Sequence, residues 1–134
     1  MKKILLLCAL FAGLSFTTNA QDVLKKATSA ASAAGFDVKS LTSGIMSKLT
    51  PKLGLTSKQK PGVTSAISSF LTDKAGILSL KQSDPATYST KQSGLFDTLK
   101  SKLGSILLAG QMNKFLGLKP KTDSPSNILS NLFY

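Results

Sequence analysis

Side chains able to carry out acid–base chemistry are scarce in this 134-residue chain. The chain contains no histidine, glutamate or arginine, and its acidic residues are six aspartates. General acid–base catalysis near neutral pH usually depends on histidine, glutamate or a lysine of altered pKa. The aspartates are spread along the chain without a close pair: Asp22, Asp37, Asp73, Asp84, Asp97 and Asp123. We therefore expect no catalytic residues, since a two-carboxylate hydrolase site would have to be assembled entirely by the fold.

Metal and cofactor sites are not indicated either. Zinc is held mainly by cysteine and histidine, and the one cysteine of the chain is Cys8. The sequence has no run of alternating acidic residues that could form a calcium loop, no glycine-rich phosphate loop and no dinucleotide fingerprint. We expect neither a metal nor a small-molecule cofactor, and we predict that the protein is not an enzyme.

The segment Ser57-Lys58-Gln59-Lys60 has the S-x-x-K spacing of penicillin-binding enzymes. Their partner motifs are missing, because Lys121-Thr122-Asp123 is not K-T-G and Ser83-Asp84-Pro85 is not S-D-N. The overlapping segment Thr56–Gln59 has the form of a capping box, in which two side chains bond to each other's backbone N–H groups. We interpret it as a helix start.

Residues 1–20 have the pattern of a secretory signal peptide. Two lysines precede an apolar run over residues 4–14, and small residues at 18–20 suit a signal peptidase that cuts between Ala20 and Gln21. The apolar run is shorter than the roughly 20 residues that a membrane-spanning helix needs. We therefore expect bacterial export of the chain, to the periplasm or to the medium.

The charge of the chain is strongly basic. All 17 cationic residues are lysines, and the formal charge of +11 becomes +9 when Lys2 and Lys3 leave with the signal peptide. Such a charge favours association with anionic surfaces such as phospholipid head groups or acidic polymers. The absence of arginine speaks against nucleic-acid recognition, which relies heavily on its bidentate hydrogen bonds. The composition favours the simpler interpretation, a solvated lysine surface that only keeps the protein in solution.

The expected domain is residues 36–134, preceded by an Ala/Ser-rich leader at 21–35 that is either a helix or a flexible segment. Within the domain, apolar residues recur at helical spacing. The longest such element, residues 91–118, is the expected centre of the fold. Its apolar face consists of Leu95, Leu99, Leu103, Ile106, Leu107 and Gly110.

Prolines and glycines set the expected ends of the helices. We predict helices at 37–50, 61–76 and 91–118, and a short one from Pro125 that Ser124 caps. Pro51 should end the first helix, and Pro61 should open the second after one tight turn.

Three further boundaries follow from the same signals. A bend near Gly110 is expected within the third helix, since glycine weakens a helix interior. Residues 81–90 and 120–124 are predicted loops. Residues 77–80 could extend the preceding helix, cross the core or form a short strand, and the sequence does not decide among these.

Aromatic side chains are expected mainly in the core. Five phenylalanines adjoin apolar residues at helical spacing: Phe36, Phe70, Phe96, Phe115 and Phe133. Tyr88 and Tyr134 are the rings expected to be exposed. Binding of single-stranded nucleic acid usually needs exposed rings interleaved with cations, so this pattern also speaks against it.

Together these patterns predict an all-α, single-domain helical bundle of about four to six helices after a cleaved signal peptide. Leu53-Gly54-Leu55 and Leu116-Gly117-Leu118 each follow an apolar helix and lead toward a proline-opened one. This similarity could mark a duplicated helix–turn–helix unit, although the abundance of leucine, glycine and lysine favours chance.

The segment Leu55-Thr56-Ser57-Lys58-Gln59 resembles the L-T-x-x-Q motif of the Spy/CpxP group of periplasmic chaperone-like proteins. The match covers five residues, and that group is rich in arginine and glutamate, which this chain lacks. The overall plan is also similar to that of small exported bacterial all-helical proteins with no assigned function. The first resemblance implies a non-enzymatic role in binding unfolded or envelope proteins.

The leading functional hypothesis is therefore an exported, non-enzymatic helical protein that binds an envelope protein or an anionic polymer. The alternative is a protein that docks on the surface of an anionic membrane, because an apolar stripe beside a lysine face is typical of interfacial helices. A hydrolase ranks third.

Overall fold

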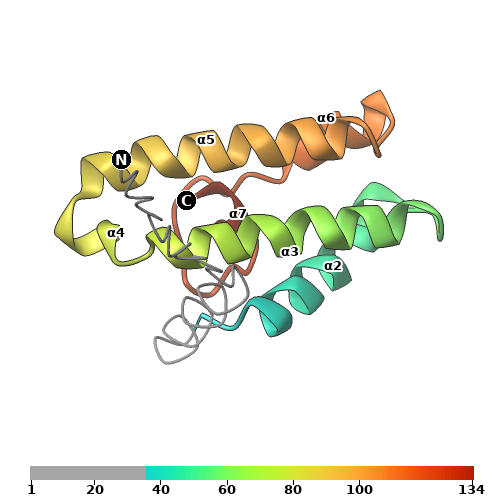
Figure 1. Ribbon diagram of the computed structural model, residues 1–134. Coiled ribbons are helices and arrows are strands. Elements are labelled where there is room, and N and C mark those ends of the chain that lie inside the picture. Colours follow the sequence, from blue (N-terminus) through green and yellow to red (C-terminus); the bar gives the residue numbers. More distant parts are fainter. Residues whose placement is uncertain (1–35) are drawn as a thin grey trace, which may run out of the picture.

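The computed structural model describes residues 36–134, which form six helices and no strand (Figure 1). The helices are α2 (Val38–Leu53), α3 (Gln59–Ile77), α4 (Leu80–Ser83), α5 (Pro85–Gly104), α6 (Ala109–Gly117) and α7 (Ser130–Phe133). The predicted all-α class is confirmed. The expected signal peptide with its cleavage position, Ala20 and Gln21, and the leader at 21–35 lie outside the described residues.

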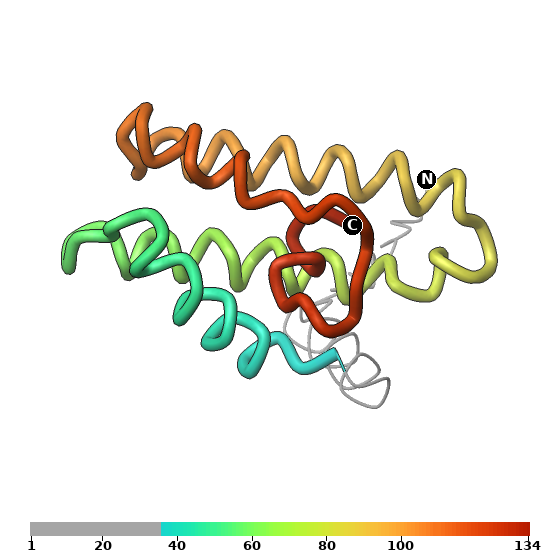
Figure 2. Tube along the Cα trace, turned by 180° about the vertical axis from the view of Figure 1, so that it is seen from behind, coloured from blue at the N-terminus to red at the C-terminus, as the bar shows by residue number. Residues whose placement is uncertain are grey.

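The long helices form a layer in which α3 lies between α2 and α5 (Figure 1). Helix α6 follows α5 and contacts both α5 and α2. Figure 2 shows the segment after α6, including α7, lying across α3 between α2 and α5. In the part of the chain from residue 36 onward, no helix has both the length and the hydropathy needed to cross a bilayer.

The core lies where the C-terminal segment meets the three long helices. Its fully buried side chains come from α2, α3, α5, α6 and α7: Ile45, Leu49, Val63, Ile67, Leu71, Leu99, Leu103, Phe115 and Leu132. The rings of Phe96, Phe115 and Phe133 lie with centroids 5.3 to 6.4 Å apart. Phe36 and Phe70 are also buried, so the prediction of a phenylalanine-rich core is confirmed.

Asp37 caps the start of helix α2, because its Oδ1 accepts hydrogen bonds from the backbone N–H of Lys39 and Ser40 at 2.9 and 3.2 Å. The helix runs to Leu53 and does not stop before Pro51, so that prediction is wrong. The buried Leu53 favours the additional turn. Gly54 then ends the helix with φ 63° and ψ 48°, the left-handed conformation that glycine adopts at least cost.

The turn expected before Pro61 belongs to α3. The carbonyl of Thr56 accepts from the N–H groups of Gln59 and Lys60 at 3.0 and 3.1 Å, so helical bonding starts there. Pro61 lies within the first helical turn, where a missing N–H leaves no bond unmade. The helix ends at Ile77, one residue beyond the predicted stop at Gly76.

The predicted loop at 81–90 is also wrong. Residues 77–80 lead through a turn into α4, and Asp84 caps α5 by accepting from the N–H of Thr87 at 3.1 Å. Pro85 occupies the first position of α5, which its fixed φ favours. The Asp-Pro pair therefore starts a helix, and α5 begins six residues before the predicted position at residue 91.

The predicted single helix over 91–118 is two helices, α5 and α6. The break lies at Ser105–Leu108, where Leu108 is extended, and not at Gly110, which is exposed within α6. Leu99, Leu103 and Leu107 of the predicted face are buried, and Leu95 and Ile106 are partly buried.

The C-terminal segment begins with the predicted loop at 120–124, but the short helix starts later than predicted. Ser124 does not cap it, because the backbone N–H of Ser124 donates to Ser130 Oγ at 3.1 Å and α7 begins at Ser130. Ile128 packs directly over Gly44 of α2, where a larger side chain would collide with it. Gly44 therefore permits the close approach of this segment to α2.

Candidate functional site

Two helix–turn–helix units pack together: α2–α3 with the first turn at residues 54–58, and α5–α6 with the second turn at residues 105–108. They meet through a pair of glutamines, Gln59 in the first turn of helix α3 and Gln111 in the first turn of helix α6. Gln59 Oε1 accepts from the N–H of Thr56 at 3.1 Å, and Gln111 Oε1 accepts from the N–H of Leu108 at 3.0 Å. Each glutamine thus caps the start of its own helix. We call this pair the glutamine junction.

The two side-chain amides of the junction also bond to each other. Gln59 Nε2 donates to Gln111 Oε1 at 2.8 Å, and Gln111 Nε2 donates to Gln59 Oε1 at 3.2 Å. Each Nε2 further donates to the opposite turn, Gln59 to Ile106 O at 3.1 Å and Gln111 to Gly54 O at 3.2 Å. Gln111 Nε2 also lies 3.1 Å from the carbonyl of the buried Leu53. The junction therefore fixes the two turns against each other.

These contacts repeat at a constant offset of 52 residues, the separation of the two glutamines. The segments 54–59 and 106–111 supply equivalent donors and acceptors, so the α2–α3 unit corresponds to the α5–α6 unit. The contacts do not pair Leu53–Leu55 with Leu116–Leu118, the sequence similarity for which chance was the favoured explanation. The counterpart of Leu55 is Leu107, and both side chains are buried.

The predicted capping box is confirmed. Gln59 N–H donates to Thr56 Oγ1 at 3.3 Å, and the Gln59 side chain returns to the Thr56 N–H. Ser57 and Lys60 are both exposed, and no hydrogen bond connects their side chains in the part of the chain that the structure describes. The S-x-x-K spacing therefore does not form a nucleophile–base pair in this arrangement.

Both turns lie at the same end of the bundle (Figures 1 and 2), and the stretches of chain that contain them are basic. Residues 38–72 and 98–122, which contain the two turns, include no aspartate. Exposed lysines flank the turns: Lys48, Lys52, Lys58, Lys60, Lys102 and Lys114. We call this end, with its six lysines, the basic pole.

Two leucines on α6 and its N-terminal cap are exposed. Leu108 is 71% exposed and Leu116 is 41% exposed. These two are the exposed ones among the large apolar side chains of residues 36–134. Leu108 lies directly in the second turn of the basic pole. Exposed cationic and apolar side chains therefore occur together there.

A shallow groove of about 310 Å³ lies between α3 and the end of α5, beside the second turn. Its lining combines one lysine with three serines and small or apolar residues: Gly62, Ser65, Ala66, Ser69, Lys102, Ser105 and Ile106. Ser105 Oγ donates to the carbonyl of Lys102 at 2.7 Å. The groove offers a cation and hydroxyl groups, which suit an anionic oxygen ligand.

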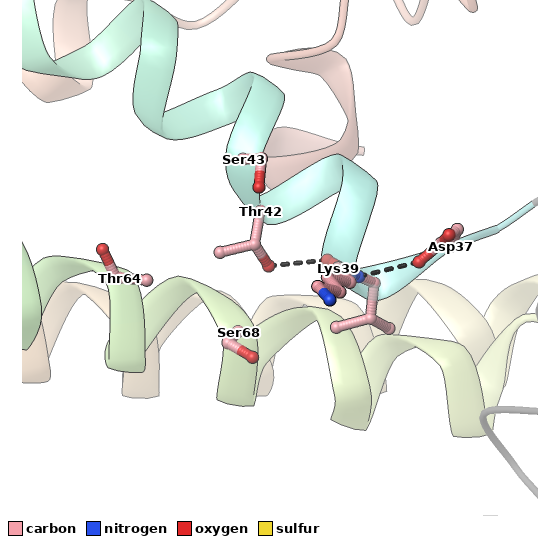
Figure 3. Close-up of a pocket in the computed structure, with 7 residues that line it drawn as sticks. Asp37, Lys39, Thr42, Ser43, Thr64 and Ser68 are labelled. Carbon is pink, nitrogen blue, oxygen red and sulfur yellow. Dashed lines mark hydrogen bonds between the residues drawn. The ribbon is translucent and has the colours of Figure 1, made fainter.

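A larger pocket of about 400 Å³ lies between the start of α2 and the middle of α3 (Figure 3). Thr42, Ser43, Thr64 and Ser68 face it. Thr42 Oγ1 donates to Val38 O at 2.6 Å and Thr64 Oγ1 donates to Lys60 O at 2.8 Å, so these hydroxyl protons are engaged by their own helices. Asp37, the carboxylate that lines the pocket, accepts hydrogen bonds from Lys39 and Ser40 and from neither threonine hydroxyl.

The far end of α3 carries a buried lysine, Lys74, which is 3% exposed. Its Nζ donates to the carbonyl of Asn131 at 2.8 Å and lies 6.0 Å from the centre of the Phe70 ring. Burial and, to a smaller extent, the positive charge of Lys81 lower the pKa of Lys74 to about 8, while the carboxylate of Asp123 acts in the opposite direction. Lys74 therefore remains largely protonated near pH 7 but loses its proton at a lower pH than an exposed lysine does.

Tyr88 lies at the same end and is buried, so the prediction that its ring is exposed is wrong. Its hydroxyl donates to the carbonyl of Tyr134 at 3.0 Å. Burial raises the pKa of Tyr88, and the carboxylate of Asp123 raises it as well. Lys74 and Tyr88 together tie the C-terminal segment to α3 and α5, and we call them the C-terminal anchor.

Gln92 lies one turn beyond Tyr88 on α5 and is buried. Neither its Nε2 nor its Oε1 has a hydrogen-bond partner among residues 36–134. A buried amide without partners costs free energy.

No hydrogen bond joins two of the five aspartates that lie in residues 36–134. Asp37 and Asp84 cap helices, and hydrogen bonds from Ser40 and Thr87 respectively lower the pKa of each carboxyl. Asp97 pairs with Lys100 at 2.9 Å and Asp123 with Lys81 at 3.0 Å. No group of three or more metal-binding side chains occurs within the described range.

Several of these residues were missed in the sequence. Gln111 has the same spacing to Leu108 as Gln59 has to Thr56, but a leucine at the capping position hides the signal. Lys74 falls on the buried stripe of α3, three and four residues after Leu71 and Phe70. That position was a usable signal, because a lysine on an apolar stripe must be either buried or at its edge.

Comparison with known proteins does not identify a relative: no family model matches the chain, and no curated protein or solved structure is significantly similar to it.

Proposed function

We propose that this protein is an exported, non-catalytic binding protein of the bacterial cell envelope that engages an anionic partner through its basic pole. The observation that carries the proposal is the placement of six exposed lysines around two turns that lie in aspartate-free stretches. Partners of the matching chemistry are an acidic envelope protein, an anionic polymer or an anionic membrane surface.

The fixed geometry of the basic pole supports the proposed binding function. The glutamine junction joins the two turns through reciprocal amide hydrogen bonds of 2.8 and 3.2 Å, which holds lysines from both helix–turn–helix units at one end. A surface of fixed geometry loses less conformational entropy on binding than lysines on a flexible tail do.

The chemistry of the remaining residues favours binding over catalysis. Asp37 and Asp84 are engaged in capping, and the Lys74 ammonium is buried against the carbonyl of Asn131. The hydroxyls of Thr42 and Thr64 are engaged by backbone carbonyls. None of these groups has the nucleophile–base geometry that acyl or phosphoryl transfer requires.

The test is binding of a soluble multivalent anion, inorganic polyphosphate, measured by calorimetry at low and high salt. The pole variant replaces three lysines: Lys52→Gln, Lys58→Gln and Lys60→Gln. The control variant removes the same charge elsewhere: Lys39→Gln, Lys91→Gln and Lys121→Gln. We expect the pole variant to lose roughly fivefold in affinity for each lysine removed.

The salt dependence provides the second readout. Affinity of the unmodified protein should fall steeply as salt rises, since contacts between exposed charges are screened. If the control variant loses as much affinity as the pole variant, the charge acts uniformly and the pole is not a binding site. If the unmodified protein binds no polyanion at low salt, the proposed function is wrong.

A further inference from the structure

Two exposed leucines share a helix with the basic pole. Leu108 and Leu116 lie eight residues apart on α6 and its cap, which places them on nearby faces about 12 Å apart along the helix. Met112 lies between them and packs against the core. Phe115 and Gln111 point inward, since the first is fully buried and the second bonds to the opposite turn. One face of helix α6 therefore packs against the rest of the bundle, and Leu108 and Leu116 lie exposed beside that face.

A second copy of the same chain is a poor occupant for these leucines. Exposed lysines flank the turn that holds Leu108, and the nearest aspartate along α5 is Asp97, which is already paired with Lys100. Pairing two such poles would bring like charges together, which opposes association. An anionic occupant is favoured instead.

A dissolved polyanion would satisfy the lysines but not the leucines. A polyphosphate or an acidic polypeptide in water presents charge and little apolar surface, so Leu108 would remain in contact with water. An anionic bilayer presents both, since phosphate groups lie above an acyl boundary into which apolar side chains can insert. The surface around Leu108 matches a bilayer in both respects. The leucine, which is 71% exposed, suits the acyl boundary, and the surrounding lysines suit the phosphate groups.

We infer that the basic pole docks on anionic phospholipid bilayers, with Leu108 and Leu116 inserted at the acyl boundary and the lysines against head-group phosphates. This inference rests on the proposed function and names the partner of the same surface. The groove with Lys102, Ser65 and Ser69 lies beside the inserting turn and offers one head-group phosphate a cation and two hydroxyls.

The experiment measures binding of the full chain to vesicles of phosphatidylglycerol and phosphatidylcholine by flotation. We expect binding to the mixed vesicles, no binding to pure phosphatidylcholine, and a loss as salt rises. Leu108→Ser should weaken vesicle binding roughly tenfold, from the lost burial of one leucine side chain. The matched control is Leu80→Ser, a partly exposed leucine in α4 at the other end of the bundle, which should leave vesicle binding unchanged.

A second variant reports insertion directly. The sequence has no tryptophan, so Leu108→Trp introduces a single indole at the pole. Its emission should shift to shorter wavelength on mixed vesicles, whereas Leu80→Trp should show no shift. This readout does not depend on the affinity of the Leu108→Ser variant.

The outcomes separate the inference from the proposed function. Polyphosphate binding by the Leu108→Ser variant should equal that of the unmodified protein, because the leucine does not contact a soluble polyanion. If the unmodified protein binds polyphosphate but not the mixed vesicles, the membrane inference is overturned and the proposed function stands. Equal vesicle binding by the Leu108→Ser variant would overturn the inference as well. If neither probe binds, both are wrong.

Discussion

The glutamine junction and the C-terminal anchor lie at opposite ends of α3, and both hold separate segments together through backbone carbonyls. The junction uses two neutral amides that satisfy each other and the carbonyls of Gly54 and Ile106. The anchor uses an ammonium group, Lys74, and a phenol, Tyr88. A neutral amide cannot change charge with pH, whereas a buried ammonium can. The two ends should therefore respond differently to mutation and to pH.

The largest expected effect is at the junction. In Gln111→Ala the carbonyl of the buried Leu53 and the N–H of Leu108 lose a partner, and Gln59 loses its opposite amide. We expect the free energy of unfolding to fall by about 3 kcal/mol, from several polar groups left unsatisfied. Urea unfolding measures it.

The control for this variant is Gln82→Ala, an exposed glutamine in α4, which should change stability by less than about 0.5 kcal/mol. Adding Gln59→Ala to Gln111→Ala should cost less than the sum of the single changes, with a coupling of about 1–2 kcal/mol. Additive losses would show that the two amides act independently, and the junction would not be a unit.

The second largest expected effect is a pH dependence of the free energy of unfolding, which should arise at the C-terminal anchor and not at the glutamine junction. The pKa of Lys74 is about 8 in the folded protein and 10.5 in the unfolded chain. Between these values the unfolded chain binds more protons, so the free energy of unfolding should rise with pH. From pH 8 to pH 10 we expect a gain of about 2 kcal/mol, measured by urea unfolding at each pH.

In Lys74→Met the rise in the free energy of unfolding from pH 8 to pH 10 should disappear. In Gln111→Ala the same rise should persist, although the protein is less stable at every pH. Lys91→Met, at an exposed lysine, should also keep it. The raised pKa of Tyr88 has the opposite sign, because the folded protein holds that proton more tightly and loses stability above about pH 10. A rise that survives in Lys74→Met would assign the pH dependence to other groups.

The smallest effect concerns the phenol of the anchor. Tyr88→Phe removes the 3.0 Å hydrogen bond to the carbonyl of Tyr134 but keeps the buried ring. We expect a loss of about 1 kcal/mol, which corresponds to a melting temperature lower by about 4–8 °C. Tyr134→Phe, whose hydroxyl bonds to Pro120 O at a half-buried site, should cost less because water can replace the lost partner.

The periodicity of apolar residues was sufficient to predict the helical fold and much of its core. Ile45, Leu49, Ile67 and Leu103 lie on the predicted stripes and are fully buried. Such stripes report which face of a helix is covered, because burial of apolar surface dominates folding free energy. They do not report where a helix starts, and Asp84-Pro85 suits either a loop or a helix start.

The polar contacts between segments distant in the sequence could not be predicted. Gln59 was identified by its local capping pattern, but its bond to Gln111 depends on how two helix–turn–helix units pack. The loop predicted for residues 81–90 implies an exposed Tyr88, whereas its hydroxyl bonds to a carbonyl 46 residues away. Contacts of this kind follow from tertiary packing, which local patterns do not encode.

The placement of the two tyrosines has an optical consequence. The chain contains no tryptophan and two tyrosines, and Tyr88 bonds to the backbone of Tyr134, whose own ring lies 5.3 Å from Lys119 Nζ. All phenolic absorbance and emission of the protein therefore arises at the seam between α5 and the C-terminal segment. Release of that segment would alter the near-ultraviolet spectrum while the helices stay intact, which gives the unmodified chain an intrinsic reporter of one local opening.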